Sequence, residues 1–360
     1  MSKPTVFIGA GTEVVVQAMI PTCQRILASG RWPEAVHVLM VDSDRRSQNR
    51  FREAALPESR ARYVRLSIHQ VREALSRHPE AFRDAWRPSW TPLLRDAPDN
   101  GASALPGLGR LMAKAARATL VHQLEEFRRQ MSVTDEGPPD IFIVLNPLSG
   151  TSRGCVYELP RLARAIWPAA TIHAIVTYPV GLERLDAQRR TLYSANFIEA
   201  LQILERYARS QRFELFLDPQ VGWEEREGQL VDNILAVDGR YGNQRLKQLD
   251  VREFQLGGGV PELMTRVADL LVGIATGDRL VDAALGRLSN ATMHRSRVEV
   301  AGRRSHCHAL NVTRMAIDPD AFRRALIARG VARALEAFTT TTEPPEGASG
   351  SDDPLSALTG

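Results

Sequence analysis

The feature that most constrains the fold is the alternation of short, continuous apolar runs with longer amphipathic stretches. Apolar runs occupy residues 5–8, 36–41, 141–145, 171–178, 214–218 and 231–237. Runs this short and this uniformly apolar are typical of parallel strands that are buried on both faces. Because helical patterns lie between several of them, the sequence predicts an α/β fold in which helices flank a parallel sheet.

Three glycine-rich loops accompany these elements. Gly9-Ala10-Gly11 follows the first run, residues 101–110 precede a helical pattern over 111–131, and residues 148–154 follow the third run. In such loops the backbone N–H groups can approach phosphate oxygens, and the following helix directs its positive end at the same anion. Each loop alone also suits an ordinary turn between a strand and a helix. Their recurrence favours a phosphate-bearing ligand.

The first loop also fits the start of a dinucleotide-binding unit. Gly9 and Gly11 follow a strand, and Asp42 ends the next strand, where an acid would bind a ribose hydroxyl. The third glycine of G-x-G-x-x-G would fall at position 14, which is Val14. A dinucleotide-binding enzyme that uses Gly9, Gly11 and Asp42 is therefore one alternative.

The second loop carries the most specific motif. Residues 101–110 read Gly-Ala-Ser-Ala-Leu-Pro-Gly-Leu-Gly-Arg. They resemble the G-A-G-x-N-P-x-x-G-R loop that lies beside the terminal phosphates in the tubulin/FtsZ superfamily. Ser103 replaces a glycine and Leu105 replaces the asparagine, and the matching residues are Gly101, Ala102, Pro106, Gly109 and Arg110.

The other two loops resemble eroded versions of the same family's loops. Residues 148–154 align with the signature G-G-G-T-G-[ST]-G at Gly150, Thr151 and Gly154. Residues 8–12 resemble the I-G-x-G-G-T-G loop of bacterial members but run directly into Glu13. In this alignment Glu13 puts a carboxylate where the family holds phosphate, and the two would repel each other.

The resemblance continues beyond the loops. Pro179 follows the strand at 171–178, and Glu183 stands where the family has a ribose-contacting acid. The arginine expected at position 187 is absent, and Arg189 and Arg190 are its nearest substitutes. The resemblance thus implies a nucleotide site that consists of Gly9, Ala10, Gly11, Thr12, Gly101, Ala102, Ser103, Gly109, Arg110, Ser149, Gly150, Thr151, Ser152, Arg153, Gly154, Glu183, Arg189 and Asn196.

The implied fold is a Rossmann-like parallel sheet flanked by helices, as in a tubulin/FtsZ-type nucleotide domain. We expect this domain to span residues 1–285. A truncated C-terminal region would follow, with a short strand and helix remnant at 286–338 and a disordered tail at 339–360, which is rich in threonine, proline, glycine and acidic residues. Members of the family follow their central helix with a second α/β domain, for which little chain is left here.

In FtsZ-like polymers, acids in a loop after the central helix polarise water at the nucleotide of the neighbouring subunit. Asp278 and Asp282 follow the helical pattern that ends near Thr276 and are the candidate catalytic pair. Their spacing departs from the family's N-x-D-x-x-D, and Asp278 also suits an ordinary N-cap. Asp238 and Asn243 are the nearest candidates for reading the base.

The overall charge and hydropathy exclude several classes of protein. The formal net charge is only +4, and the aromatic residues among the arginines of residues 45–95 do not interleave with them in a stacking pattern, so nucleic-acid binding is not expected. No stretch reaches the length of apolar chain that a membrane helix needs. We expect a cytoplasmic protein that has protein partners or associates with itself.

Cysteine and histidine residues indicate neither disulfides nor a metal site. The three cysteines, Cys23, Cys155 and Cys307, lie far apart in the sequence and form no recognisable framework. His306 and His308 would share one side of a strand, but no further ligand is evident.

Three functions follow from these patterns. The first is a divergent bacterial tubulin-like pseudo-GTPase that binds guanine nucleotide weakly or not at all and acts as a scaffold. The second is an active, filament-forming GTPase that binds GTP or GDP with Mg²⁺, in which Ser149, Thr151, Ser152 and Arg153 replace the glycine contacts. The third is the dinucleotide-binding enzyme.

Overall fold

The computed structural model describes residues 3–30, 32–97, 101–102, 105–131, 137–177, 186–209, 212–216, 222–237, 260–278, 281, 299–300, 303–304 and 307–310. These residues all belong to one unit of the chain, Met1–Thr313. At its centre is a seven-stranded sheet of order β11-β8-β5-β4-β1-β2-β3 in which every neighbouring pair is parallel. The predicted α/β fold is confirmed. The strands are β1 (Thr5–Ala10), β2 (Val36–Asp42), β3 (Ala61–Arg65), β4 (Asp140–Leu145), β5 (Thr171–Thr177), β8 (Asn233–Val237) and β11 (Cys307–Leu310).

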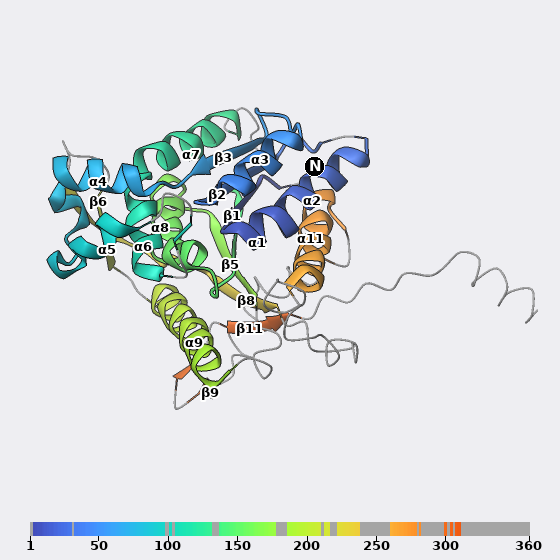
Figure 1. Cartoon of the computed structure of the whole chain (residues 1–360). Coiled ribbons are helices and arrows are strands. Elements are labelled where there is room, and N and C mark those ends of the chain that lie inside the picture. The colour runs from blue at the N-terminus through green and yellow to red at the C-terminus, as the bar shows by residue number, and fades with distance from the viewer. Residues whose placement is uncertain are drawn as a thin grey trace, which may run out of the picture. The chain divides into compact units, whose positions relative to one another are not determined.

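Helices cover both faces of the sheet, which explains why its central strands are continuously apolar. Along β1, Phe7 belongs to one buried cluster, whereas Val6 and Ile8 belong to the other. The Phe7 face packs against α2 (Ile20–Ala28) and α11 (Val260–Thr276), which lie side by side in Figure 1. The opposite face is covered by α6 (Pro106–Ala115), α7 (Arg117–Met131), α8 (Gly150–Ile166) and α9 (Ala187–Arg209).

The sequence of residues 45–99, between β2 and α6, predicts a mostly helical segment with a proline-rich loop, and the structure contains a strand there as well. Its helices are α3 (Arg45–Glu53), α4 (Ile68–Arg77) and α5 (Thr91–Asp96), with 3-10 turns at Pro79–Phe82 and Pro88–Trp90. β3 pairs with β2 and forms one edge of the sheet. An edge strand is only partly buried, so the Ala-Arg-Tyr-Val-Arg sequence of β3 lacks the apolar run that marks the central strands.

Two of the glycine-rich segments are more helical than expected. α6 begins at Pro106, so Gly109 and Arg110 lie within a helix and not in a loop. Proline is favourable there because its ring fixes a helical φ and its missing N–H is not needed in the first turn. Likewise α8 begins at Gly150 and includes Gly154. The helical pattern predicted over 111–131 forms two helices that meet at Ala116.

Two regions that were predicted to contain strands form antiparallel pairs outside the main sheet. The run at 214–218 corresponds to β6 (Arg212–Phe216), which pairs with β7 (Trp223–Glu227) in a separate antiparallel pair. The region 297–317 holds β9 (Glu299–Val300) and β10 (Arg303–Arg304), also antiparallel, besides β11. The helix expected in the remnant at 286–338 and the tail at 339–360 lie outside the described residues. Within the described part of the chain, no helix combines the length and apolarity needed to cross a membrane.

Candidate functional site

The strand order reverses between β1 and β4, and we call the region outside the carboxyl ends of these two strands the crevice. β2 and β3 follow on one side of β1, and β5, β8 and β11 follow on the far side of β4. The helix after β1 packs on one face of the sheet and the helix after β4 on the other. In open α/β sheets, ligands bind where such a reversal separates the loops at the carboxyl ends of the strands. The first and third glycine loops both lie here, so this crevice is the candidate functional site.

The two loops at the crevice are in direct contact. Gly11 follows β1 with a φ of 93°, a conformation that favours glycine. A Cβ atom added to Gly11 would lie 2.9 Å from the Cβ of Ser152 and 3.0 Å from the Oγ of Ser149. The approach of the first loop to the first turn of α8 therefore requires glycine at this position, whether or not a ligand binds.

Hydroxyl groups of the third loop are bonded within the protein. Ser149 is the N-cap of α8, and its Oγ accepts from the backbone N of Ser152 at 3.5 Å. The Oγ of Ser152 accepts from the backbone N of Asn146 at 2.7 Å, and the Thr151 and Ser43 hydroxyl oxygens lie 2.6 Å apart. These residues are buried apart from Ser149. A phosphate would have to compete with these bonds to use the same hydroxyls.

Asp42, at the end of β2, is fully buried. Its carboxylate accepts from the Thr12 hydroxyl at 2.9 Å, the Ser47 hydroxyl at 2.5 Å and the backbone N of Ser43 at 2.8 Å. Burial raises the pKa of Asp42 to about 6, against the lowering effect of these hydrogen bonds. Asp42 thus joins the loops after β1 and β2, and it does not present the open carboxylate that ribose binding by a dinucleotide enzyme requires.

Glu13 lies in the first turn of the helix that follows β1. Burial raises the pKa of its carboxyl and the charge of Asp44 adds to this, while the Glu13 backbone N–H and Arg46 act in the opposite direction. Its Oε2 is buried without a hydrogen-bond partner. In a glycine loop, this helix start would face a phosphate. The chain places its own carboxylate there instead.

Three of the motif glycines lie where α6 crosses α8. A Cβ atom on Gly109 would overlap the carbonyl oxygen of Gly150. A Cβ atom on Gly154 would overlap the backbone of Gly109 and Arg110. Two helical backbones approach this closely only where side chains are absent. Helix packing alone therefore accounts for glycine at positions 109 and 154.

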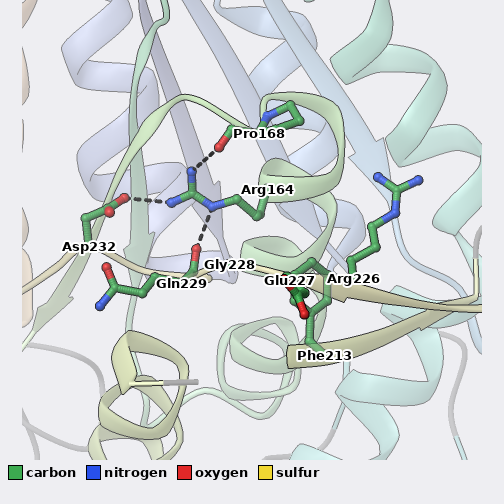
Figure 2. Close-up of a pocket in the computed structure, with 8 residues that line it drawn as sticks. All are labelled: Arg164, Pro168, Phe213, Arg226, Glu227, Gly228, Gln229 and Asp232. Carbon is green, nitrogen blue, oxygen red and sulfur yellow. Dashed lines mark hydrogen bonds and ion pairs between the residues drawn. The ribbon is translucent and has the colours of Figure 1, made fainter. Parts of the chain in front are cut away.

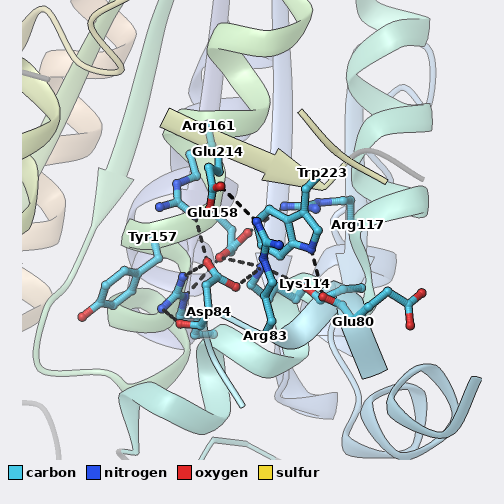
Figure 3. Close-up of polar contacts among 12 residues, drawn as sticks. Glu80, Arg83, Asp84, Lys114, Arg117, Tyr157, Glu158, Arg161, Glu214 and Trp223 are labelled. Atoms are coloured by element: carbon cyan, nitrogen blue, oxygen red, sulfur yellow. Dashed lines mark hydrogen bonds and ion pairs between the residues drawn. The ribbon is translucent and has the colours of Figure 1, made fainter. Parts of the chain in front are cut away.

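Arg110, expected near the terminal phosphates, points into a buried charge cluster. Its Nε donates to Glu158 at 3.2 Å, and its two Nη atoms donate to the backbone oxygen and the carboxylate of Asp84. The guanidinium carbon lies 4.4 Å from the centre of the Tyr157 ring. Figure 3 shows its partners Asp84 and Glu158 in the same cluster of side chains. The cation of Arg110 is therefore engaged inside the protein.

Glu158 is the central carboxylate of this cluster. It lies 3.0 Å from a guanidinium nitrogen of Arg117 and 3.8 Å from the Nζ of Lys114. Burial alone would raise the pKa of Glu158, but the charges of Lys114, Arg117 and Arg110 lower it to about 2. Trp223 of β7 covers the cluster, with its ring centre 4.9 Å from Lys114 Nζ (Figure 3). The only signal in the sequence is the helical spacing of the three cations.

Arg153 and Asn196, both predicted to bind nucleotide, are brought together by the fold. The guanidinium of Arg153 donates to Oδ1 of Asn196 and to the carboxylate of Glu199, both on α9. Glu199 also accepts from the Tyr157 hydroxyl at 3.0 Å. Only 5% of the Arg153 side chain is exposed. These contacts join the first turn of α8 to α9 and use the cation that we expected at a phosphate.

Other predicted site residues are placed as follows. Gly9 and Ala10 are buried within β1, and Ala102 is buried beside Gly101, whose φ is 89°. Arg189 is exposed and pairs with Asp186 at 3.4 Å. For each of these residues, contact with a nucleotide stays a prediction.

Of the candidate catalytic pair, only Asp278 is described. It is exposed, and its Oδ1 accepts from the backbone N of Val281 at 3.4 Å, as an N-cap would. Among the described residues, no His, Cys, Asp and Glu side chains are grouped to hold a metal ion. Cys23 and Cys155 are buried free thiols. Several residues named above lie outside the described residues, and their roles stay predictions: Ser103, Glu183, Asp238, Asn243, Asp282 and His306.

A cavity of about 400 Å³ lies at the amino ends of β5 and β8, where no site was predicted (Figure 2). Arg164 lines it and donates to the backbone oxygens of Gln229 at 2.5 Å and Pro168 at 2.8 Å, and to Asp232 at 2.7 Å. Asp232 also accepts from the backbone N of Ile172 at 2.7 Å. The guanidinium thus holds three chain segments together at this corner.

Comparisons with known proteins give similarities at low identity. No family model and no curated protein matches the sequence. A GTPγS-bound protofilament of CetZ2 from Haloferax volcanii is 15% identical with a TM-score of 0.44, over 76% of this chain and 59% of that chain. An empty FtsZ dimer from M. jannaschii is 14% identical with a TM-score of 0.42, over 76% of this chain and 56% of that one.

TubZ from Clostridium botulinum phage c-st is 11% identical with a TM-score of 0.38, over 75% of this chain and 60% of that chain. The described chain thus matches less than two thirds of the length of these proteins. These identities and TM-scores do not assign the chain to a family.

Proposed function

We propose that this protein is a divergent tubulin/FtsZ-like protein that acts as an assembly or scaffold component and binds guanine nucleotide weakly or not at all. The strand order, the crevice between β1 and β4 and the motif from Gly101 to Arg110 support the superfamily. The carboxylate of Glu13 at the first helix start is the observation that supports the loss of nucleotide binding. The partners would be other proteins or copies of this chain.

The charges of Glu13, Arg110 and Arg153 explain why a nucleotide would bind weakly or not at all. A bound phosphate at the helix start after β1 would meet the Glu13 carboxylate, and like charges at short distance repel. The cations that would offset this repulsion are engaged elsewhere, Arg110 with Glu158 and Arg153 with Glu199. GTP or GDP, accompanied by Mg²⁺, would have to break these ion pairs to recruit either cation.

Calorimetric titration of the full chain with GTP, GDP, ATP and NAD, each in the presence of Mg²⁺, tests the proposal. We expect no binding, or only weak binding of the guanine nucleotides. Micromolar binding of GTP together with phosphate release would instead establish an active GTPase. Binding of NAD without binding of GTP would establish the dinucleotide-binding alternative.

A further inference from the structure

An open cavity of about 570 Å³ lies on the helical segment that connects β3 to α6. None of the residues described above in the loops after β1, β2 and β4 lines this cavity. Its walls come from α4, from α5 and from the chain between the two 3-10 turns, and they consist of Arg72, Leu75, Ser76, Trp86, Thr91, Leu94 and Arg95.

The floor of this cavity is apolar. Leu75 and Trp86 are half-buried, and Leu94 is buried beneath them with 6% of its surface exposed. Apolar surface that remains open to solvent commonly marks a protein contact. Tryptophan and arginine, both present here, are the residue types most enriched at the centres of such contacts.

The rim of the cavity is positively charged. The Arg72 guanidinium is fixed at the end of α5, where it donates to the backbone oxygens of Leu94 at 2.7 Å and Arg95 at 3.0 Å. Among the described residues, no carboxylate lines the cavity and none pairs with Arg72. Within the described part of the chain, Arg95 pairs with its exposed neighbour Asp96 at 3.1 Å, a contact that water screens strongly. The charge of this rim is complementary to carboxylates.

We infer that this surface binds an acidic segment of a partner protein. A leucine or aromatic side chain of the segment lies on Leu75, Trp86 and Leu94, and flanking carboxylates pair with Arg72 and Arg95. The apolar floor supplies most of the affinity, whereas the rim arginines select the sign of the partner's charge. The inference gives the proposed scaffold a partner surface, and it does not depend on whether nucleotide binds.

Fluorescence anisotropy of the full chain with a short labelled peptide, in which glutamates flank a Leu-Phe pair, tests this surface. We expect saturable binding that the double variant Arg72→Glu/Arg95→Glu weakens by about tenfold or more. The variant Arg52→Glu/Arg206→Glu makes the same change in net charge at exposed positions away from the cavity, and it should bind like the unmodified chain.

A second variant tests the same surface in case the Arg72→Glu/Arg95→Glu chain does not fold. Ser76→Glu adds a carboxylate at an exposed position on the cavity wall and leaves both arginines in place, so it should also weaken binding. Hydrogen exchange should slow in α4 and α5 when the peptide is added. Weakening by Ser76→Glu in a chain with unchanged thermal unfolding would confirm that the cavity itself is the binding surface.

Several outcomes would overturn the inference. They are an absence of saturable binding, equal weakening by the control variant, and equal binding of a peptide with lysines in place of glutamates. Displacement of the probe by DNA would make the surface a nucleic-acid site, and displacement by a peptide of residues 340–360 would assign it to this chain's own acidic segment. Loss of self-association in Arg72→Glu/Arg95→Glu would assign it to a second copy.

Discussion

Glu13 stands at a helix start where the aligned N–H groups would otherwise attract an anion. Burial raises its pKa, and its Oε2 has no hydrogen-bond partner, so the position is poorly suited to a carboxylate for the sake of stability alone. Under the proposed function, this carboxylate acts instead by repelling a phosphate at the crevice. Removing the charge of Glu13 is therefore the most direct test of the proposed loss of nucleotide binding.

We predict that Glu13→Gln increases the affinity for GTP by about tenfold, because it removes a negative charge at the helix start where we expect phosphate and keeps the size of the side chain. Calorimetric titration with GTP and Mg²⁺ measures the change. Glu53→Gln, at an exposed position of α3, alters the net charge equally and should leave GTP binding unchanged. A folded Glu13→Gln variant with the affinity of the unmodified chain would show that Glu13 is not the obstacle.

At the scale of single residues, the sequence shows which positions are unusual, but it does not show what each of those residues contacts. Glu13 was recognised because a charged residue interrupts a loop of small ones. Gly109 and Gly154 were read as phosphate contacts, yet a missing side chain serves a close helix crossing as well as a close approach to phosphate. For Arg110, its partner Glu158 lies 48 residues away in sequence, so no local pattern reveals that the guanidinium is engaged.

The crossing of α6 and α8 leads to a prediction at the scale of elements. Gly109→Ala and Gly154→Ala should each lower the free energy of unfolding by about 3 kcal/mol, because the added methyl group overlaps backbone atoms that cannot move without separating the helices. In Gly107→Ala, also on α6, the atoms nearest to the methyl group belong to the ring of Trp90 and not to a backbone, and the loss should be about 1 kcal/mol.

Urea unfolding of the three variants tests this difference. If Gly154→Ala is as stable as Gly107→Ala, the crossing does not need glycine, and a phosphate-binding role for residue 154 becomes the better explanation.

The buried histidines of two strands make stability depend on pH. His37 in β2 and His173 in β5 are buried, and burial lowers the pKa of each from 6.5 to about 4. Folding favours their neutral form, so their contribution is complete above pH 6.5 and is lost as the pH falls through about 4. Asp42 acts in the opposite direction, because its pKa of about 6 makes folding favour its protonated form.

One substitution distinguishes the contribution of His173 from that of Asp42. His173→Gln should flatten the decline in the free energy of unfolding between pH 6.5 and pH 4, because glutamine does not titrate and Asp42 is unchanged. Urea unfolding at a series of pH values measures the slope. Equal slopes for the variant and the unmodified chain would mean that His173 is not held neutral by the fold.

Elements were predictable where burial is complete. The central strands are apolar throughout because helices cover both faces, so β1, β2, β4 and β5 could be recognised as short apolar runs. β3 was missed because only one of its edges is paired. β6 was placed in the main sheet because a short apolar run does not reveal which strand is its partner, and that partner is β7.

At the scale of the whole molecule, the crevice and the proposed docking surface lie on different parts of the fold. The crevice is built by the loops after β1, β2 and β4, whereas the docking surface is built by α4 and α5. The charge cluster around Glu158 joins α6, α7 and α8 to the segment that follows α4. Buried ion pairs of this kind favour one arrangement of the elements that they connect. The docking segment is thereby fixed to the sheet even with an empty crevice.

This separation leads to a prediction about assembly. If the crevice does not take up nucleotide, self-association depends on protein concentration alone, because a ligand shifts an equilibrium only through a difference in its affinity for the two states. Sedimentation velocity over a range of concentrations should therefore give the same distribution of species with and without GTP or GDP and Mg²⁺. Glu13→Gln supplies the internal comparison, since restored binding gives GTP a means to alter that distribution. Growth of large species in the unmodified chain only when GTP is present would contradict the scaffold proposal and favour the active GTPase.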